Sequence, residues 1–173
     1  SSVTPAGAAS LDVATRTVLL PYRDQTITKD FLLREAERKG SETTEFPSWK
    51  DDLRMWAAKM STELDAGRIG DGLPVELTAI RLGPAVLFFA QGELFNRYQV
   101  ELKKRLPNTP LFVVGYTNGE IGYIPDAEAF AHPGYETDMA YVYTNQPSPL
   151  TAEVERVFLD NAVATIEELT CSE

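Results

Sequence analysis

The passage from Ala85 to Gly115 constrains the fold of this chain more than any other segment. It starts with the longest uninterrupted apolar run, Ala85 to Ala90, and ends with a second apolar run, Leu111 to Gly115. Between them, Glu93 to Arg105 has apolar residues at helical spacing and predicts a helix. A wholly apolar strand is typical of the centre of a sheet. The passage therefore predicts an α/β (mixed α+β) domain, a layered mixed sheet with flanking helices.

Other segments add strands and helices to this framework. Thr28 can cap a helix that ends near Gly40, and Ser48 with Asp51 forms a capping-box pattern for a helix that closes at Gly67. The glycine-rich turn 70–74 precedes the strand that is expected at Val75 to Leu82. Further strands are expected at Thr15 to Leu20, Val75 to Leu82 and Ile121 to Ile124. A closing helix is expected at Pro149 to Leu169.

Size and charge exclude several classes of protein. With 173 residues the chain is long enough for one domain with a core, and its formal net charge of -10 argues against nucleic-acid binding and against docking on anionic lipid. The run from Ala85 to Ala90 is far shorter than the roughly 18 residues of a spanning helix, so no transmembrane segment is expected.

The first ten residues and the rare residue types set further limits. Residues 1–10 are rich in Ser, Ala and Gly and are expected to be a linker or disordered start, which leaves 11–173 as the domain. Cys171 is the single cysteine, so an internal disulfide is excluded. With His132 as the single histidine, the chain cannot complete a usual zinc site by itself.

Polar groups near predicted strand ends are the candidates for chemistry. Glu93 follows an apolar strand, where α/β proteins often carry sites, although it could also only complement a helix dipole. Segment 115–123 contains Asn118-Gly119, which favours a tight hairpin, whereas a functional interpretation uses its glycines for close backbone approach to a ligand and its tyrosines to direct phenols at that ligand. Tyr135 could donate to a developing oxyanion or pack at the surface. His132 is read as an exposed loop residue.

Three of these segments together resemble the neutral, non-lysosomal ceramidases, which are zinc-dependent amidases. The resemblance covers Val75 to Tyr143 and rests on Gly92-Glu93 with the later Arg97, on Gly115 and Asn118 followed by Tyr123, and on Tyr135-Glu136. The resemblance implies that this domain is the C-terminal portion of a larger catalytic domain and is therefore incomplete.

The resemblance implies a role for each matching residue. Glu93 and Tyr123 would be zinc ligands, and Tyr135 would stabilise the carbonyl oxygen as it gains charge. Two further histidine ligands are expected from an upstream segment or a second chain of the same protein, so this chain alone is expected to be inactive. If these roles hold, the Glu93 carboxylate and the Tyr123 hydroxyl lie close together and Tyr135 lines the same cleft.

The expected function is hydrolysis of a lipid-like or other N-acyl amide by metal-activated water, and the resemblance suggests a secreted, periplasmic or membrane-peripheral protein. The alternative is a non-catalytic interaction domain that retains the fold without a complete metal site.

Overall fold

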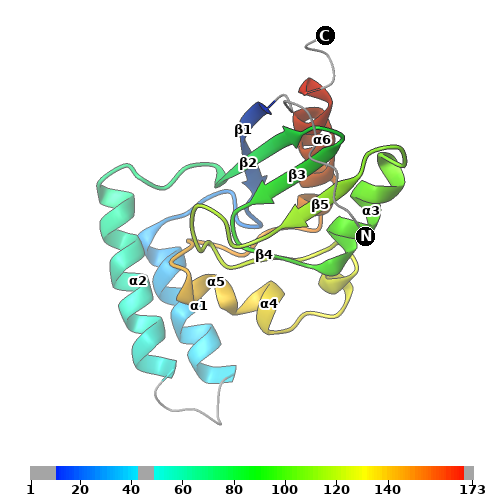
Figure 1. Ribbon diagram of the computed structural model, residues 1–173. Helices are drawn as coiled ribbons and strands as arrows, with labels where there is room; N and C mark the ends of the chain where they lie inside the picture. Colours follow the sequence, from blue (N-terminus) through cyan, green and yellow to red (C-terminus); the bar gives the residue numbers. More distant parts are fainter. Residues whose placement is uncertain (1–10, 43–48, 170–173) are drawn as a thin grey trace.

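A four-stranded mixed sheet forms the centre of the molecule (Figure 1). The computed structural model describes residues 11–42 and 49–169, so the expectations for residues 1–10, Ser48 and Cys171 lie outside the described residues. The first three strands in spatial order are antiparallel, and the fourth runs parallel to the third. In that order the strands are β1 (Leu11–Pro21), β2 (Gly72–Leu82), β3 (Ala85–Ala90) and β5 (Leu111–Val114).

The strand pairing confirms the layered α/β prediction and extends two strands, since β1 runs over Leu11–Pro21 instead of Thr15 to Leu20. Strand β3 has the predicted bounds and a central place in the sheet, and Gly83, with a φ of 58°, turns the chain between β2 and β3. Strand β2 begins at Gly72 instead of Val75, because β1 continues to pair with it as far as Pro21 opposite Gly72.

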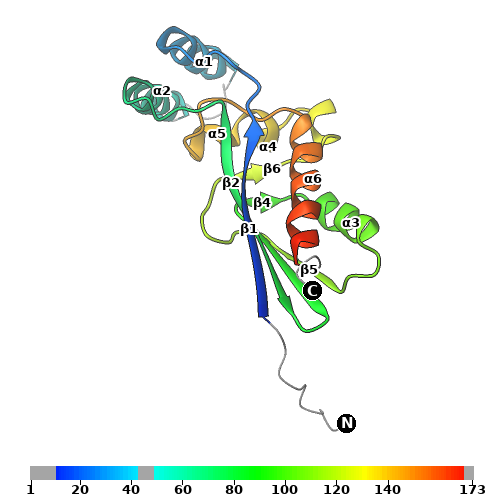
Figure 2. The ribbon, with the colours of Figure 1, turned by 90° about the horizontal axis from the view of Figure 1, so that it is seen from above.

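Two helices cover one face of this sheet. Helix α3 (Asn96–Arg105) connects β3 to β5, and α6 (Glu153–Glu168) runs beside it (Figure 2). On this face the ring of Phe158 packs edge-on against Phe88 at 6.1 Å and against Tyr98 at 4.8 Å between ring centroids. These aromatic contacts stabilise the packing of α3 and α6 against the sheet.

Helix α6 starts later than its predicted beginning at Pro149. Leu150 instead forms a β-bridge with Tyr22, and the Thr151 amide donates to the Pro21 carbonyl. The chain is therefore tied to the end of β1 before the helix begins.

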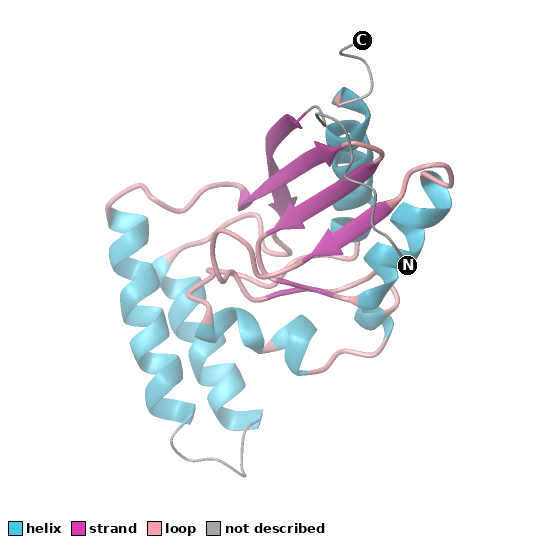
Figure 3. Ribbon diagram, in the orientation of Figure 1, coloured by secondary structure: helices cyan, strands magenta, loops and turns pink. Residues whose placement is uncertain are grey.

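The helices α1 (Lys29–Glu42) and α2 (Trp49–Asp65) stand beyond one end of the sheet (Figure 3). The Thr28 hydroxyl accepts a hydrogen bond from the Phe31 amide, which confirms the predicted cap. The pair has a second core, in which Trp56 and Leu53 pack with helix α5 (Ala140–Tyr143). Within residues 11–42 and 49–169, no helix has both the length and the hydropathy of a membrane span.

Candidate functional site

Glu93 lies in a short strand and not at the start of a helix. Strand β4 (Glu93–Leu94) pairs in parallel with β6 (Tyr123–Ile124), and this register sets Glu93 directly beside Tyr123. The Glu93 amide donates to the Gly122 carbonyl at 2.8 Å. The predicted start of a helix at Glu93 is therefore wrong, and so is its role in complementing a helix dipole, because α3 begins three residues later, at Asn96.

Two glycines allow this close pairing. Gly92 has a φ of +76°, and a Cβ added there would lie 2.6 Å from the Gly122 carbonyl oxygen. Gly122 has a φ of +89°, with the Thr144 side chain 2.9 Å from the position of an added Cβ. A side chain at either position would disrupt the approach of the two segments, so these glycines are needed for the site's geometry.

The segment around Asn118 is a loop and not the tight hairpin that Asn-Gly favours. Strand β5 before it pairs with β3 in the four-stranded sheet, whereas β6 after it belongs to the separate β4–β6 pair. The loop is held to the sheet, because Asn118 Nδ2 donates to Glu76 Oε1 at 2.9 Å and Gln91 Nε2 donates to the Asn118 carbonyl at 3.0 Å. Tertiary hydrogen bonds thus replace the local ladder of a hairpin.

Tyr116 is a further member of the site, to which the sequence pattern assigned no role beyond its place among the tyrosines of segment 115–123. Its amide donates to the Gly92 carbonyl at 2.8 Å, and its ring is 58% exposed. Hydrogen bonding to the Glu93 carboxylate is the main cause that raises the pKa of Tyr116 to about 12. The negative charge of Glu93 is likewise the main cause of a raised pKa at Tyr123. Glu93 therefore faces two phenols, and it keeps both protonated.

The rings of the site continue into an aromatic strip. Tyr123 contacts Phe95 at 6.4 Å and Tyr135 at 6.1 Å between ring centroids. Tyr135 contacts Tyr143, which contacts Trp49, each at 6.3 Å. The structure thus brings Glu93, Tyr123 and Tyr135 into one neighbourhood, and their roles as ligands and donor stay predictions.

A buried ionic cluster fixes the helix that carries Tyr135. Tyr135 is the first residue of α4 (Tyr135–Asp138), and Asp138 is the last. Lys39 Nζ donates to the Asp138 carbonyl oxygen and, at 2.9 Å, to its carboxylate. Arg23 lies 3.0 Å from the same carboxylate and 3.6 Å from Glu35. The orientation of Tyr135 is consequently tied to α1.

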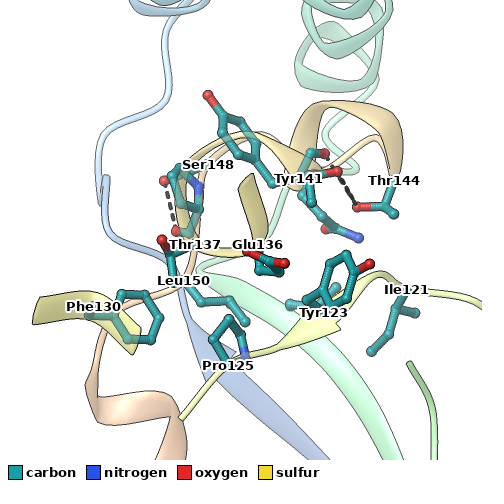
Figure 4. A pocket seen from close by; sticks show the side chains of 14 residues that line it. Ile121, Tyr123, Pro125, Phe130, Glu136, Thr137, Tyr141, Thr144, Ser148 and Leu150 are labelled. Atoms are coloured by element: carbon teal, nitrogen blue, oxygen red, sulfur yellow. Dashed lines mark hydrogen bonds between the residues drawn. The ribbon is translucent and has the colours of Figure 1, made fainter. Parts of the chain in front are cut away.

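The three predicted site residues line different hollows. Glu93 lies with Tyr116 in a hollow of about 320 Å³, and Tyr135 lines another of about 320 Å³ together with Trp49. Tyr123 lines a cavity of about 20 Å³, which Figure 4 shows with Glu136 among its walls. The expectation that Tyr135 shares one cleft with the other two is wrong in this structure, because neither Glu93 nor Tyr123 lines the hollow of Tyr135.

The donors at this place fit part of a zinc site. Glu93 and Tyr123 offer two oxygen atoms, whereas zinc sites in proteins have three or four protein ligands. Among the described residues, no three or more His, Cys, Asp or Glu side chains are grouped to hold a metal ion. His132, after the turn η1 (Ala129–Ala131), is exposed as expected. The described residues therefore do not complete a metal site.

Comparison with known proteins finds a distant structural likeness. No protein-family model and no curated protein matches the chain. The structure of neutral ceramidase from Pseudomonas aeruginosa matches with a TM-score of 0.39 and 15% identity, over 92% of this chain and 29% of that chain. This is a distant structural resemblance, and the chain spans less than a third of the length of that protein.

Proposed function

We propose that this chain is the part of a zinc-dependent amide hydrolase, similar to neutral ceramidases, that carries two metal ligands and an oxyanion donor. The observation that carries the proposal is the convergence of Glu93, Tyr123 and Tyr135. Glu93 and Tyr123 are 30 residues apart in the sequence, and Tyr135 follows 12 residues later. The β4–β6 register and one ring contact bring them together.

In this proposal each of the three residues has its own chemical role. The Glu93 carboxylate and the Tyr123 phenol bind the cation, and the Tyr135 hydroxyl donates to the substrate oxygen as it becomes negative. When bound, zinc would lower the pKa of a coordinated water to about 7 and so supply hydroxide at neutral pH. A cation between Glu93 and Tyr123 also offsets the carboxylate charge that raises the pKa of Tyr123, and so favours the phenolate.

The proposal also includes a partner, which supplies the missing nitrogen ligands, and a substrate class. Two histidines come from an upstream segment or a second chain of the same protein, and the substrate is a lipid-like or other N-acyl amide. The chain by itself has no complete set of ligands among its described residues and hydrolyses nothing.

Zinc titration with and without free imidazole tests this proposal, because imidazole can replace the absent histidines. Imidazole should tighten zinc binding, and the ultraviolet spectrum of tyrosinate should appear at neutral pH as zinc binds. Glu93→Gln should weaken zinc binding by at least roughly 10-fold. Tyr123→Phe should remove the tyrosinate signal. Tyr143→Phe, which removes an exposed hydroxyl elsewhere on the aromatic strip, is the matched control.

The second candidate is a non-catalytic interaction domain, and a specific observation favours it. Tyr135 and Glu93 line separate hollows, and Tyr116 shares the hollow of Glu93, whose carboxylate raises the Tyr116 pKa. Zinc that fails to bind in the presence of imidazole, or that binds equally well to Glu93→Gln and Tyr123→Phe, would refute the hydrolase and support this candidate.

A further inference from the structure

The face of the central sheet opposite α6 and α3 carries apolar side chains and no helix that the structure describes. Figure 2 shows both helices on the same side of the sheet. Because side chains alternate along a strand, residues paired across strands share a face. One cross-strand row is Val13, Ile80, Leu87 and Phe112.

The rows on either side of it also carry apolar side chains. Leu11, Leu82 and Ala85 form one apolar row. In the row on the other side, Phe89 and Val114 are apolar, and the hydroxyl groups of Thr15 and Thr78 hydrogen-bond to each other. We call this surface the open face, and its strand residues are Leu11, Val13, Thr15, Thr17, Leu19, Pro74, Glu76, Thr78, Ile80, Leu82, Ala85, Leu87, Phe89, Phe112 and Val114.

The distribution of charge on the sheet is the reverse of that of a sheet with one solvated face. Such a sheet points polar residues to water and apolar residues to its helices. Here Asp12, Arg16 and Arg81 point to the helix side, where Arg16 pairs with Glu168 of α6. Among the described strand residues of the open face, Glu76 is the single charged one, and it lies at the end near Asn118.

The open face is also large enough for a stable protein interface. Five of its apolar side chains are between 52 and 66% exposed: Leu11, Val13, Leu19, Leu82 and Phe112. At roughly 200 Å² for a fully exposed large apolar side chain, these five leave about 600 Å² accessible. The half-buried members raise this to about 800 Å², which is the area that each partner contributes to an interface of standard size.

We propose that the open face is a dimer interface, on which a second copy of this chain packs face to face. Two such sheets stack about 10 Å apart with their strands about 30° from alignment, which is the geometry of a β-sandwich. The contact is self-complementary, because a mostly apolar surface, with Glu76 as the single charged residue among its described strand residues, meets an identical surface across a two-fold axis. It closes at two copies, since each copy has used its open face. This inference does not depend on the metal proposal.

The net charge gives the dimer a characteristic salt response. Each copy has a formal net charge of -10, so two copies repel one another at long range while the interface itself excludes charge. Added salt screens this repulsion and strengthens apolar contact, and the dimer is therefore more stable at high ionic strength.

Sedimentation and light scattering of the whole chain test the proposal. The expected mass is twice 19.2 kDa. Val13→Lys and Phe112→Lys lie at opposite edges of the open face, at exposed positions that the folded monomer tolerates. Each should weaken dimerisation by about 100-fold or more, because an unpaired ammonium group would be buried between the sheets. Met55→Lys adds the same charge at a 64% exposed position on α2 and should leave the mass unchanged.

Circular dichroism of each variant establishes that it is folded. An interface of this area should give a dimer at about 100 µM, so a chain that stays monomeric at that concentration overturns the proposal. This holds even if another polypeptide is later found bound to the open face. Open-ended polymers, or a dimer that is weakened by Met55→Lys and not by the two open-face variants, overturn it as well.

Discussion

Replacement of Lys39 by methionine should destabilise the protein strongly, because this ammonium group holds together a buried cluster of charges. Lys39 is 3% exposed, lies 2.9 Å from the Asp138 carboxylate and 3.8 Å from that of Glu35, and faces the Tyr141 ring at 5.4 Å. Lys39→Met keeps an unbranched apolar stem of similar size and removes the charge. The two carboxylates then lose a buried cation.

The expected cost lies at the lower end of the range for a broken buried ion pair, which is about 3 to 5 kcal/mol. Two other cations remain in the cluster, since Arg23 lies 3.0 Å from Asp138 and Arg38 lies 2.7 Å from Glu35. We therefore expect a loss of about 3 kcal/mol in the free energy of unfolding. For a chain of this length, that corresponds to a fall of roughly 6 to 12 °C in Tm.

Urea unfolding and differential scanning calorimetry measure this loss. Lys103→Met is the matched control, because Lys103 is exposed on α3 and the same substitution there should change stability by less than about 0.5 kcal/mol. A loss below about 1 kcal/mol in Lys39→Met, or one equal to that of the control, would refute the reasoning.

The same cluster makes a pH-dependent contribution with a definite sign. Burial opposes ionisation of Glu35 and Asp138, but hydrogen bonds and charges from Arg38, Lys39 and Arg23 outweigh it, so both carboxyl groups have pKa values below their usual range. A lowered pKa gives stability that is present above the unfolded value of about 4 and is lost as pH falls through the folded value. The stability difference between the wild type and Lys39→Met should therefore shrink as the pH is lowered below about 4. A constant difference in urea unfolding across this range would contradict the assignment.

Two further predictions concern the β4–β6 site. In Glu93→Gln, the pKa of Tyr116 should fall from about 12 towards its usual value near 10, as followed by NMR titration of the labelled ring, and an unchanged value would exclude the hydrogen bond between them. Gly92→Ala should destabilise the fold by roughly 1 to 3 kcal/mol more than Gly67→Ala, because both have positive φ but only at Gly92 would the added Cβ meet backbone, the Gly122 carbonyl. Equal losses in urea unfolding would show that backbone strain alone accounts for the effect.

The site itself was predictable only in its residue types and their order. Glu93, Tyr123 and Tyr135 were named from the resemblance to neutral ceramidases; the structure sets Glu93 beside Tyr123 and the ring of Tyr123 against that of Tyr135, but the three residues line different hollows. Tyr116 was grouped with the tyrosines of its glycine-rich segment but received no role of its own, because nothing local marks its positive φ of 56° or the influence of Glu93 on its pKa. The β4–β6 register joins residues 30 positions apart, and no local pattern encodes such a contact.

The sequence by itself determined the main strands and helices and the mixed α/β class. Apolar periodicity is a local property, and it marked β3 to the residue and the closing helix within a few residues. Only the tertiary structure decided that Glu93 enters a strand, that Asn118 starts no hairpin, and that the sheet has one face covered by helices and one open. Each of these depends on where a backbone hydrogen bond or an apolar side chain finds its partner, and those partners come from distant parts of the chain.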